Sequence, residues 1–146
     1  MLEKINVDIV SAMKEHDTLK LSTLRLLKGA VDLERINKRV DKLNDDDIIA
    51  IIAKQIKTRK ESIVEFEKGN RQDLIDKTNS EIEILSAYMP EQIGEEELSN
   101  IIEQAIKEVN ATTIKDMGSV MKIVSSKVKG RADMQQVSSI IKSKLN

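Results

Sequence analysis

Pro90 is the only proline in a chain of 146 residues, and apolar residues recur with helical spacing on both sides of it. A helix rarely continues through a proline, whose ring also pushes the preceding residue out of the helical region. The segment PEQIG adds Gly94 shortly after the proline. We therefore expect a domain boundary here, with an N-terminal domain at residues 1–90 and a C-terminal domain at residues 91–146.

The apolar residues predict a core of aliphatic side chains. Hydrophobic residues make up 40% of the chain, yet Phe66 and Tyr88 are its only aromatic residues, and 34% of the residues are charged. This balance is typical of a helical protein packed with leucine and isoleucine, and not of a disordered chain. No segment alternates with the two-residue period of a strand. The predicted fold class is all-α, with an N-terminal helical bundle followed by a small three-helix domain.

Composition excludes several classes of function. The chain has no cysteine, so disulfides, thiolate nucleophiles and cysteine-bound metals are ruled out. No apolar run approaches the ~20 residues of a membrane-spanning helix. Acidic residues in the first turns do not fit a signal peptide. We therefore expect no membrane association and a cytoplasmic location.

The second of four helices expected before Pro90 has an unusual pattern. It should begin at Asp17 or Thr18, either of which can cap its N-terminus, and run to about Arg39. Two apolar stripes lie side by side along it: Leu24, Leu27 and Val31 in one, and Leu26, Ala30 and Leu33 in the other. Together they predict a broad buried face that contacts several other helices.

The third and fourth helices also carry recognisable ends. Asn44 should cap the third helix, and the aspartates that follow suit the positive end of the helix dipole. Gly69 is expected to end it in the left-handed conformation. The fourth helix follows in RQDLIDKTNSEIEILSAYMP, where the ring of Tyr88 is expected to pack at the domain joint with its hydroxyl outward.

No combination of residues in the sequence supports catalysis. His16 is the only histidine, and its place at an expected helix end is typical of a surface residue. Phosphate loops, dinucleotide fingerprints and nucleophile elbows are absent. The cluster Asp45–Asp47 is better explained by the helix dipole than by a metal, because successive residues at a helix start point in different directions. We expect no catalytic residue, no metal and no cofactor.

The C-terminal third of the chain separates its charges. Residues 91–110 carry six acidic residues and one lysine, whereas residues 111–146 carry seven basic residues and two acidic ones. Within the basic part, VKGRAD places Gly130 where one helix should end and Asp133 where the next should begin. Two interpretations remain open: a turn that only joins two helices, or a surface that contacts the phosphates of a polyanion.

Several segments of the sequence resemble, in order, the GatB/YqeY family. KDMGSVMKIVSSKVKGRADMQQVSSIIKSKL is similar to the family's helix around D-M-G, its K-G-[KR]-A-D turn and its terminal helix. ILSAYMPEQIGEEEL is similar to the Y-L-P-x-Q break, and FEKGNRQDLIDKTNSEIE to the segment before it. The resemblance covers essentially the whole chain, and it is to the stand-alone YqeY-like proteins and not to full GatB.

The resemblance implies a function for the C-terminal domain. In the GatB subunit of the glutamine-dependent aspartyl/glutamyl-tRNA amidotransferase, the similar domain is a mobile tail that helps to hold the tRNA body. We therefore expect a non-catalytic accessory protein that binds the backbone of tRNA, or a tRNA-dependent enzyme complex. A protein–protein interaction module is the alternative. Carbon–nitrogen ligase activity with glutamine as amido-N donor is less favoured, because the chain lacks the GatB catalytic domain.

The predicted tRNA-binding surface follows from the same resemblance. The residues that match the family's tail are Gly118, Lys122, Lys127, Lys129, Gly130 and Arg131. Arg131 stands where lysine is also usual in the family, so the positive charge is kept. Lys142 and Lys144 are added through the charge argument alone, on the expectation that the basic residues share one surface around the turn.

Overall fold

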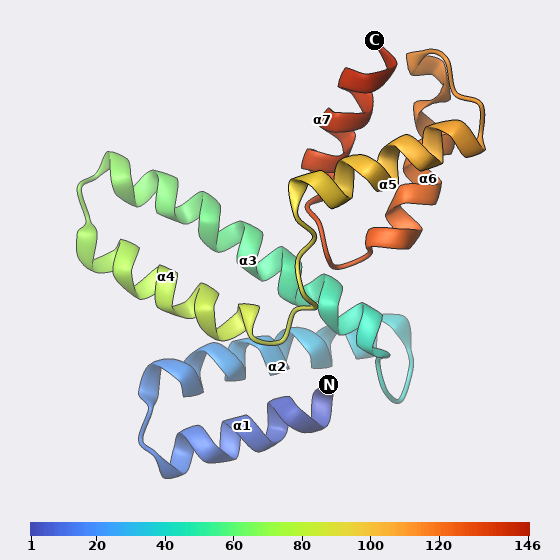
Figure 1. The fold of residues 1–146 in the computed structure, drawn as a ribbon. Helices are drawn as coiled ribbons and strands as arrows, with labels where there is room; N and C mark the ends of the chain where they lie inside the picture. The colour runs from blue at the N-terminus through green and yellow to red at the C-terminus, as the bar shows by residue number, and fades with distance from the viewer. The chain divides into compact units, whose positions relative to one another are not determined.

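The computed structural model describes residues 1–146 and contains seven α-helices, one short 3₁₀ helix and no strand (Figure 1). The all-α prediction is therefore confirmed. The chain divides into two compact units, Met1–Met89 and Pro90–Asn146, which we call unit 1 and unit 2. None of the helices combines the length and the hydropathy that a membrane crossing requires.

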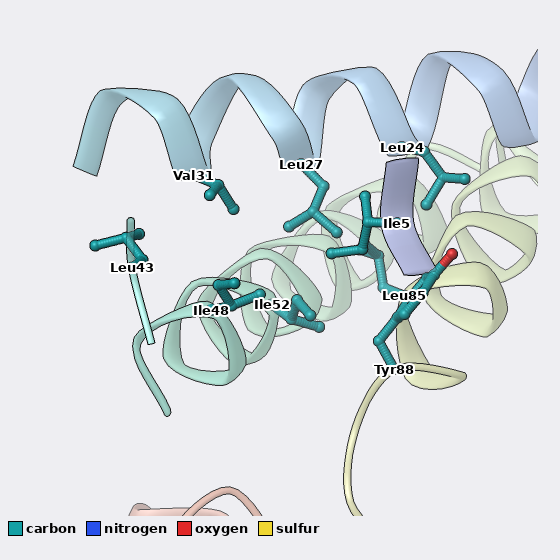
Figure 2. Packing of buried hydrophobic residues seen from close by; sticks show 9 residues of the cluster. All are labelled: Ile5, Leu24, Leu27, Val31, Leu43, Ile48, Ile52, Leu85 and Tyr88. Atoms are coloured by element: carbon teal, nitrogen blue, oxygen red, sulfur yellow. The ribbon is translucent and has the colours of Figure 1, made fainter. Parts of the chain in front are cut away.

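Unit 1 consists of four helices, and α2 contacts each of the other three. Figure 1 shows α3 and α4 side by side as an antiparallel pair. The helices are α1 (Leu2–Lys14), α2 (Thr18–Lys38), α3 (Asp45–Lys68) and α4 (Gln72–Ser86). Figure 2 shows the core between them, which is formed by Ile5, Leu24, Leu27, Val31, Leu43, Ile48, Ile52, Leu85 and Tyr88.

The predicted N-caps of unit 1 are confirmed. The Asp17 carboxylate accepts a hydrogen bond from the Lys20 amide at 3.1 Å, and the Asn44 side chain accepts one from the Asp47 amide at 2.8 Å. The left-handed conformation predicted for Gly69 is wrong, because its φ is −92° and the next residue, Asn70, has a φ of 53°. Asparagine tolerates the left-handed region better than most residues, so the turn can occur one residue later.

The broad buried face predicted for α2 is only half correct. Leu24, Leu27 and Val31 are buried, but Leu26 and Leu33 are 62% and 61% exposed. The three neighbouring helices cover one side of α2 and leave the two leucines of the second stripe exposed, while Ala30 is half-buried.

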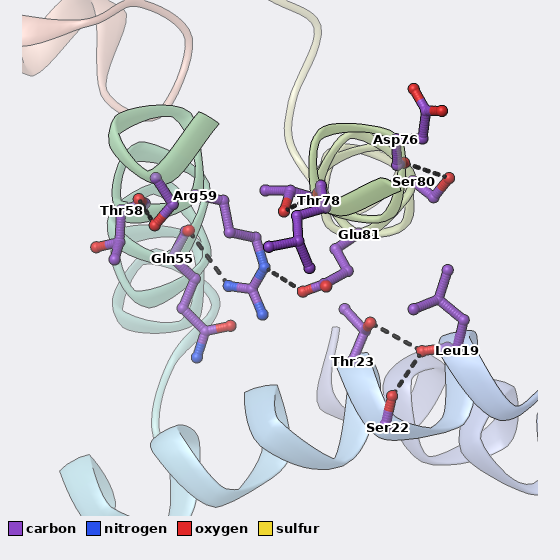
Figure 3. Close-up of polar contacts among 12 residues, drawn as sticks. Leu19, Ser22, Thr23, Gln55, Thr58, Arg59, Asp76, Thr78, Ser80 and Glu81 are labelled. Carbon is purple, nitrogen blue, oxygen red and sulfur yellow. Dashed lines mark hydrogen bonds and ion pairs between the residues drawn. The ribbon is translucent and has the colours of Figure 1, made fainter. Parts of the chain in front are cut away.

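Polar contacts inside unit 1 also correct the prediction for Tyr88. Its ring is buried, and its hydroxyl donates a hydrogen bond to the Asp8 carboxylate instead of pointing outward. Burial, together with this bond, raises the pKa of Tyr88 above its ordinary value. A second partly buried contact joins α3 to α4, where Nε of Arg59 lies 2.9 Å from Oε2 of Glu81 (Figure 3).

Unit 2 packs three short helices around its own core. They are α5 (Glu95–Glu108), α6 (Met117–Val128) and α7 (Met134–Leu145), and the 3₁₀ helix η1 (Ile114–Asp116) leads into α6. The buried residues are Leu98, Ile102, Ala105, Val120, Val124, Val128, Val137, Ile141 and Leu145. Five of these nine residues are valine or alanine, whereas the core of unit 1 has one valine and no alanine, so the core side chains of unit 2 are smaller on average.

Candidate nucleic-acid interface

The outer face of α6 carries two of the residues predicted to contact tRNA. Valines at every fourth position from Val120 to Val128 are fully buried, so the opposite side of the helix faces solvent. Gly118 and Lys122 lie on this exposed side. A Cβ atom added at Gly118 would meet no atom within 4 Å, which shows that the surface is open at the start of α6.

A shallow depression lies beside this face, between α6 and the residue that follows α5. It is lined by Val109, Ser119, Lys122, Ile123, Ser126 and Lys127. Two predicted lysines, Lys122 and Lys127, therefore border the same hollow. Nζ of Lys127 lies 3.8 Å from Oε2 of Glu108, an exposed ion pair of little strength, whereas Lys122 makes no ion pair.

The start of α6 is fixed by the aspartate of the D-M-G motif. The Asp116 carboxylate accepts hydrogen bonds from the amides of Thr112 and Thr113 at 3.0 and 3.3 Å. These bonds lower the pKa of Asp116, because they stabilise its charged form. Thr113 completes a capping box with Asp116, so the motif positions Gly118 on the first turn of the helix.

The turn after α6 is held by the segment that begins at Pro90. Gly130 has a φ of 75°, in the left-handed region that glycine favours where a helix ends. Its carbonyl accepts a hydrogen bond from Nε2 of Gln92 at 3.1 Å. Nε of Arg131 donates to the Glu91 carbonyl at 3.2 Å, and the amide of Ile93 donates to the Arg131 carbonyl at 2.9 Å. We call these three bonds the turn clamp.

The turn clamp gives Gly130 and Arg131 a structural role that the sequence did not reveal. It joins the PEQIG and VKGRAD segments, which lie about 40 residues apart and were predicted separately as a boundary and a turn. Three glutamates, Glu95–Glu97, open α5 just beyond the clamp. The turn is therefore less positive than its own residues suggest, although Lys129 is exposed there as the C-cap of α6.

The basic residues of α7 lie away from the turn. Asp133 caps α7, as predicted, by accepting a hydrogen bond from the Gln135 amide at 3.1 Å. At 1.5 Å per residue, Lys142 lies roughly 14 Å further along the helix axis. Nζ of Lys144 lies 2.8 Å from Oε1 of Glu103 on α5, and this bond lowers the pKa of Glu103. The eight predicted residues thus spread over unit 2, and only Lys122 and Lys127 share a hollow.

Fold and surface together define a two-unit, all-helical protein whose small C-terminal unit presents lysines on α6. A family model described as "Yqey-like protein" matches residues 2–145. The chain therefore belongs to the YqeY-like family, and the resemblance to the stand-alone members of the GatB/YqeY family is confirmed.

Curated relatives from fungi share the name "Altered inheritance of mitochondria protein 41, mitochondrial". The protein of Pyrenophora tritici-repentis is 31% identical over 142 residues, which cover 94% of this chain and 77% of the relative. The Kluyveromyces lactis protein is 35% identical over 81 residues, 56% of this chain and 44% of the relative. The protein of Saccharomyces cerevisiae strain YJM789 is 25% identical over 130 residues, 89% of this chain and 69% of the relative. The match thus spans less than half of the Kluyveromyces protein.

These relatives overturn the predicted cytoplasmic location, since each of them is named as a mitochondrial protein. The prediction rested on the lack of cysteines, of a signal peptide pattern and of a membrane-spanning run. None of these features distinguishes the cytoplasm from the interior of a mitochondrion, so composition carried no information on this point.

Proposed function

We propose that unit 2 binds the sugar–phosphate backbone of tRNA through the outer face of α6, and that the chain is a non-catalytic accessory protein of tRNA-dependent enzymes. The observation that carries this proposal is the depression bordered by Lys122 and Lys127. Ser119 and Ser126 line it with hydroxyl groups, which can donate hydrogen bonds to phosphate oxygens. Membership in the YqeY-like family adds support through the likeness of unit 2 to the GatB tail.

Electrostatic attraction is the expected source of affinity. Lysines that neutralise phosphates release counterions, so binding should weaken steeply as salt rises. The exposed pair between Lys127 and Glu108 costs little to exchange for a phosphate contact. Both aromatic residues, Phe66 and Tyr88, lie in unit 1, so unit 2 offers no ring on which a base could stack. Recognition would therefore depend on the shape and backbone of the RNA.

The other six predicted residues contribute to binding in different ways. Gly118 leaves room for a close approach of the backbone at the start of α6. Lys129 and Lys142 add positive charge at exposed positions. Gly130 and Arg131 act mainly by holding the turn. Lys144 contributes a positive charge that is paired with Glu103.

The test is fluorescence anisotropy of the full chain with labelled tRNA at three salt concentrations. Replacing Lys122 and Lys127 with alanine should weaken binding by about tenfold or more at low salt, and reduce the salt slope by about 2. The matched control replaces Lys57 and Lys60, two exposed lysines of α3 in unit 1, and should bind like the wild type.

Two further controls make the result specific. A double-stranded DNA of matched length should bind more weakly than tRNA, because its groove geometry differs. Circular dichroism should show that the Lys122 and Lys127 variant is folded, since both side chains are exposed. Absence of tRNA binding at low salt, or binding that the double variant leaves unchanged, would contradict the proposal.

A further inference from the structure

The outer face of α2 carries apolar side chains that nothing in unit 1 covers. Leu26, Leu33 and Ile36 are 62%, 61% and 61% exposed. Together with Ser22 and Gly29 they recur along the helix in alternating steps of four and three residues. This spacing is that of the contact seam between two paired helices, in which every first and fourth residue of a heptad faces the partner.

Two positions of this seam carry small residues, which leave room for side chains of a second helix. Gly29 lies in the interior of a 21-residue helix, where glycine is disfavoured. Nothing in unit 1 requires it, because a Cβ atom at this position would meet no atom within 4 Å. Ser22 lines a shallow depression with Thr18, Leu21, Arg25 and Leu26. Such hollows can receive large side chains from a second helix.

We propose that two copies of this chain pair through α2, antiparallel, about a two-fold axis that passes between Leu26 and Gly29. In this register Leu26 packs against the partner's Gly29, and Leu33 packs against the partner's Ser22. Ile36 meets the partner's Leu19 at the end of the seam. The central side chains thus meet large against small, and the two-fold symmetry makes each contact twice. A parallel pair would instead oppose glycine to glycine and leave a gap.

The charges beside the seam fit the same register. Arg25 and Asp32 each stand one residue before a seam leucine, on the same side of it. In an antiparallel pair these equivalent positions face each other, so each Arg25 meets the partner's Asp32. Neither residue makes an ion pair within its own chain. Opposite charges that face each other across the seam favour this self-complementary pair over other registers.

Burial of Ser22 in such an interface would leave no donor without a partner. Its hydroxyl already donates a hydrogen bond to the Leu19 carbonyl at 3.1 Å within α2, as Figure 3 shows. A buried hydroxyl that lacks a partner opposes association, and here that penalty does not arise.

Sedimentation equilibrium of the full chain over a wide concentration range tests the proposal. We expect a reversible monomer–dimer equilibrium. Leu33→Glu should raise the dimer dissociation constant by about 100-fold, because the two-fold axis places a carboxylate in the seam twice. Val64→Glu is the matched control: Val64 is 50% exposed on α3, outside the seam, and the same change there should leave the dissociation constant unaltered.

Charge exchange tests the register itself. Arg25→Glu and Asp32→Arg should each weaken the homodimer by about tenfold, because each sets like charges against each other. A mixture of the two variants should form a heterodimer of restored affinity, detectable by native mass spectrometry. A wild-type chain that stays monomeric, a dimer insensitive to Leu33→Glu, or a mixture that is not restored would overturn the proposal.

Discussion

Unit 1 and unit 2 each pack helices around an apolar core, but they differ in helix length and in the residues that form the core. Unit 1 uses helices of up to 24 residues and a core rich in leucine and isoleucine. Unit 2 uses helices of 12 to 14 residues and a core in which five of the nine buried residues are valine or alanine. A smaller unit buries a smaller share of its surface, so fixed turns and caps matter more to its stability. The turn clamp and the Asp116 cap are such devices.

Core truncation should separate the two units most clearly. Leu24→Ala in unit 1 and Ile102→Ala in unit 2 each remove a fully buried side chain, at a cost of about 3 kcal/mol. Because unit 2 is the smaller unit, we expect Ile102→Ala to unfold it while unit 1 stays folded. Amide hydrogen exchange resolved by residue measures both. If protection is lost equally in the two units after Ile102→Ala, the comparison fails.

The contact between α3 and α4 should give the next largest effect. Arg59→Ala leaves the Glu81 carboxylate, which is only 18% exposed, without its partner at 2.9 Å. We expect a loss of about 2 kcal/mol in the free energy of unfolding of unit 1. The control is Lys68→Ala, since Lys68 and Glu65 form a pair that is about 70% exposed and should contribute almost nothing. Urea unfolding of both variants provides the measurement, and equal losses would contradict the role of Arg59.

The left-handed turn at Gly130 should contribute less, and only to unit 2. Gly130→Ala forces a side chain into the left-handed region, which costs about 1.5 kcal/mol. Gly118→Ala is the matched control in the same unit, because its added Cβ enters open space at a helical position. The midpoint of thermal unfolding of unit 2 should be lower for Gly130→Ala than for the wild type. For Gly118→Ala it should be unchanged or higher. A neutral Gly130→Ala would show that the left-handed turn does not stabilise unit 2.

The pH dependence of unit 2 should show the smallest effect. Hydrogen bonds from Thr112 and Thr113 lower the pKa of Asp116 below 3.8, so its contribution to stability is complete above that value. The contribution disappears as the pH falls through the lowered pKa, because protonation removes the charged acceptor. Asp116→Asn should therefore reduce the acid sensitivity of unit 2 in this window. Denaturant midpoints above and below pH 3.8 measure the difference, and identical acid sensitivity would contradict it.

Helix positions and caps could be predicted from the sequence because they depend on local chemistry. Asp17, Asn44 and Asp133 cap helices where predicted, and α6 ends just before Gly130, where a helix end was predicted. The exposed stripe of α2 could not be recognised, because periodicity shows which residues share a face and not whether a neighbour covers it.

The sequence could predict which unit carries the candidate site, but not how its residues are arranged in space. The charge separation pointed to unit 2, yet α7 carries Lys142 away from the turn. The turn clamp was hidden because its partners lie about 40 residues apart, and no local pattern pairs Gln92 with the Gly130 carbonyl. The contact of Tyr88 with Asp8 spans 80 residues and was missed for the same reason.

Nuclear magnetic resonance of the full, ¹⁵N-labelled chain during a tRNA titration tests the central claim most directly, since it reports on every amide separately. The account predicts that the largest shift changes fall on Gly118, Ser119, Lys122 and Ser126, and that raising the salt reverses them. Unit 1 amides such as Leu33 should change little. Shift changes concentrated on unit 1, or none at low salt, would contradict the assignment of tRNA binding to the outer face of α6.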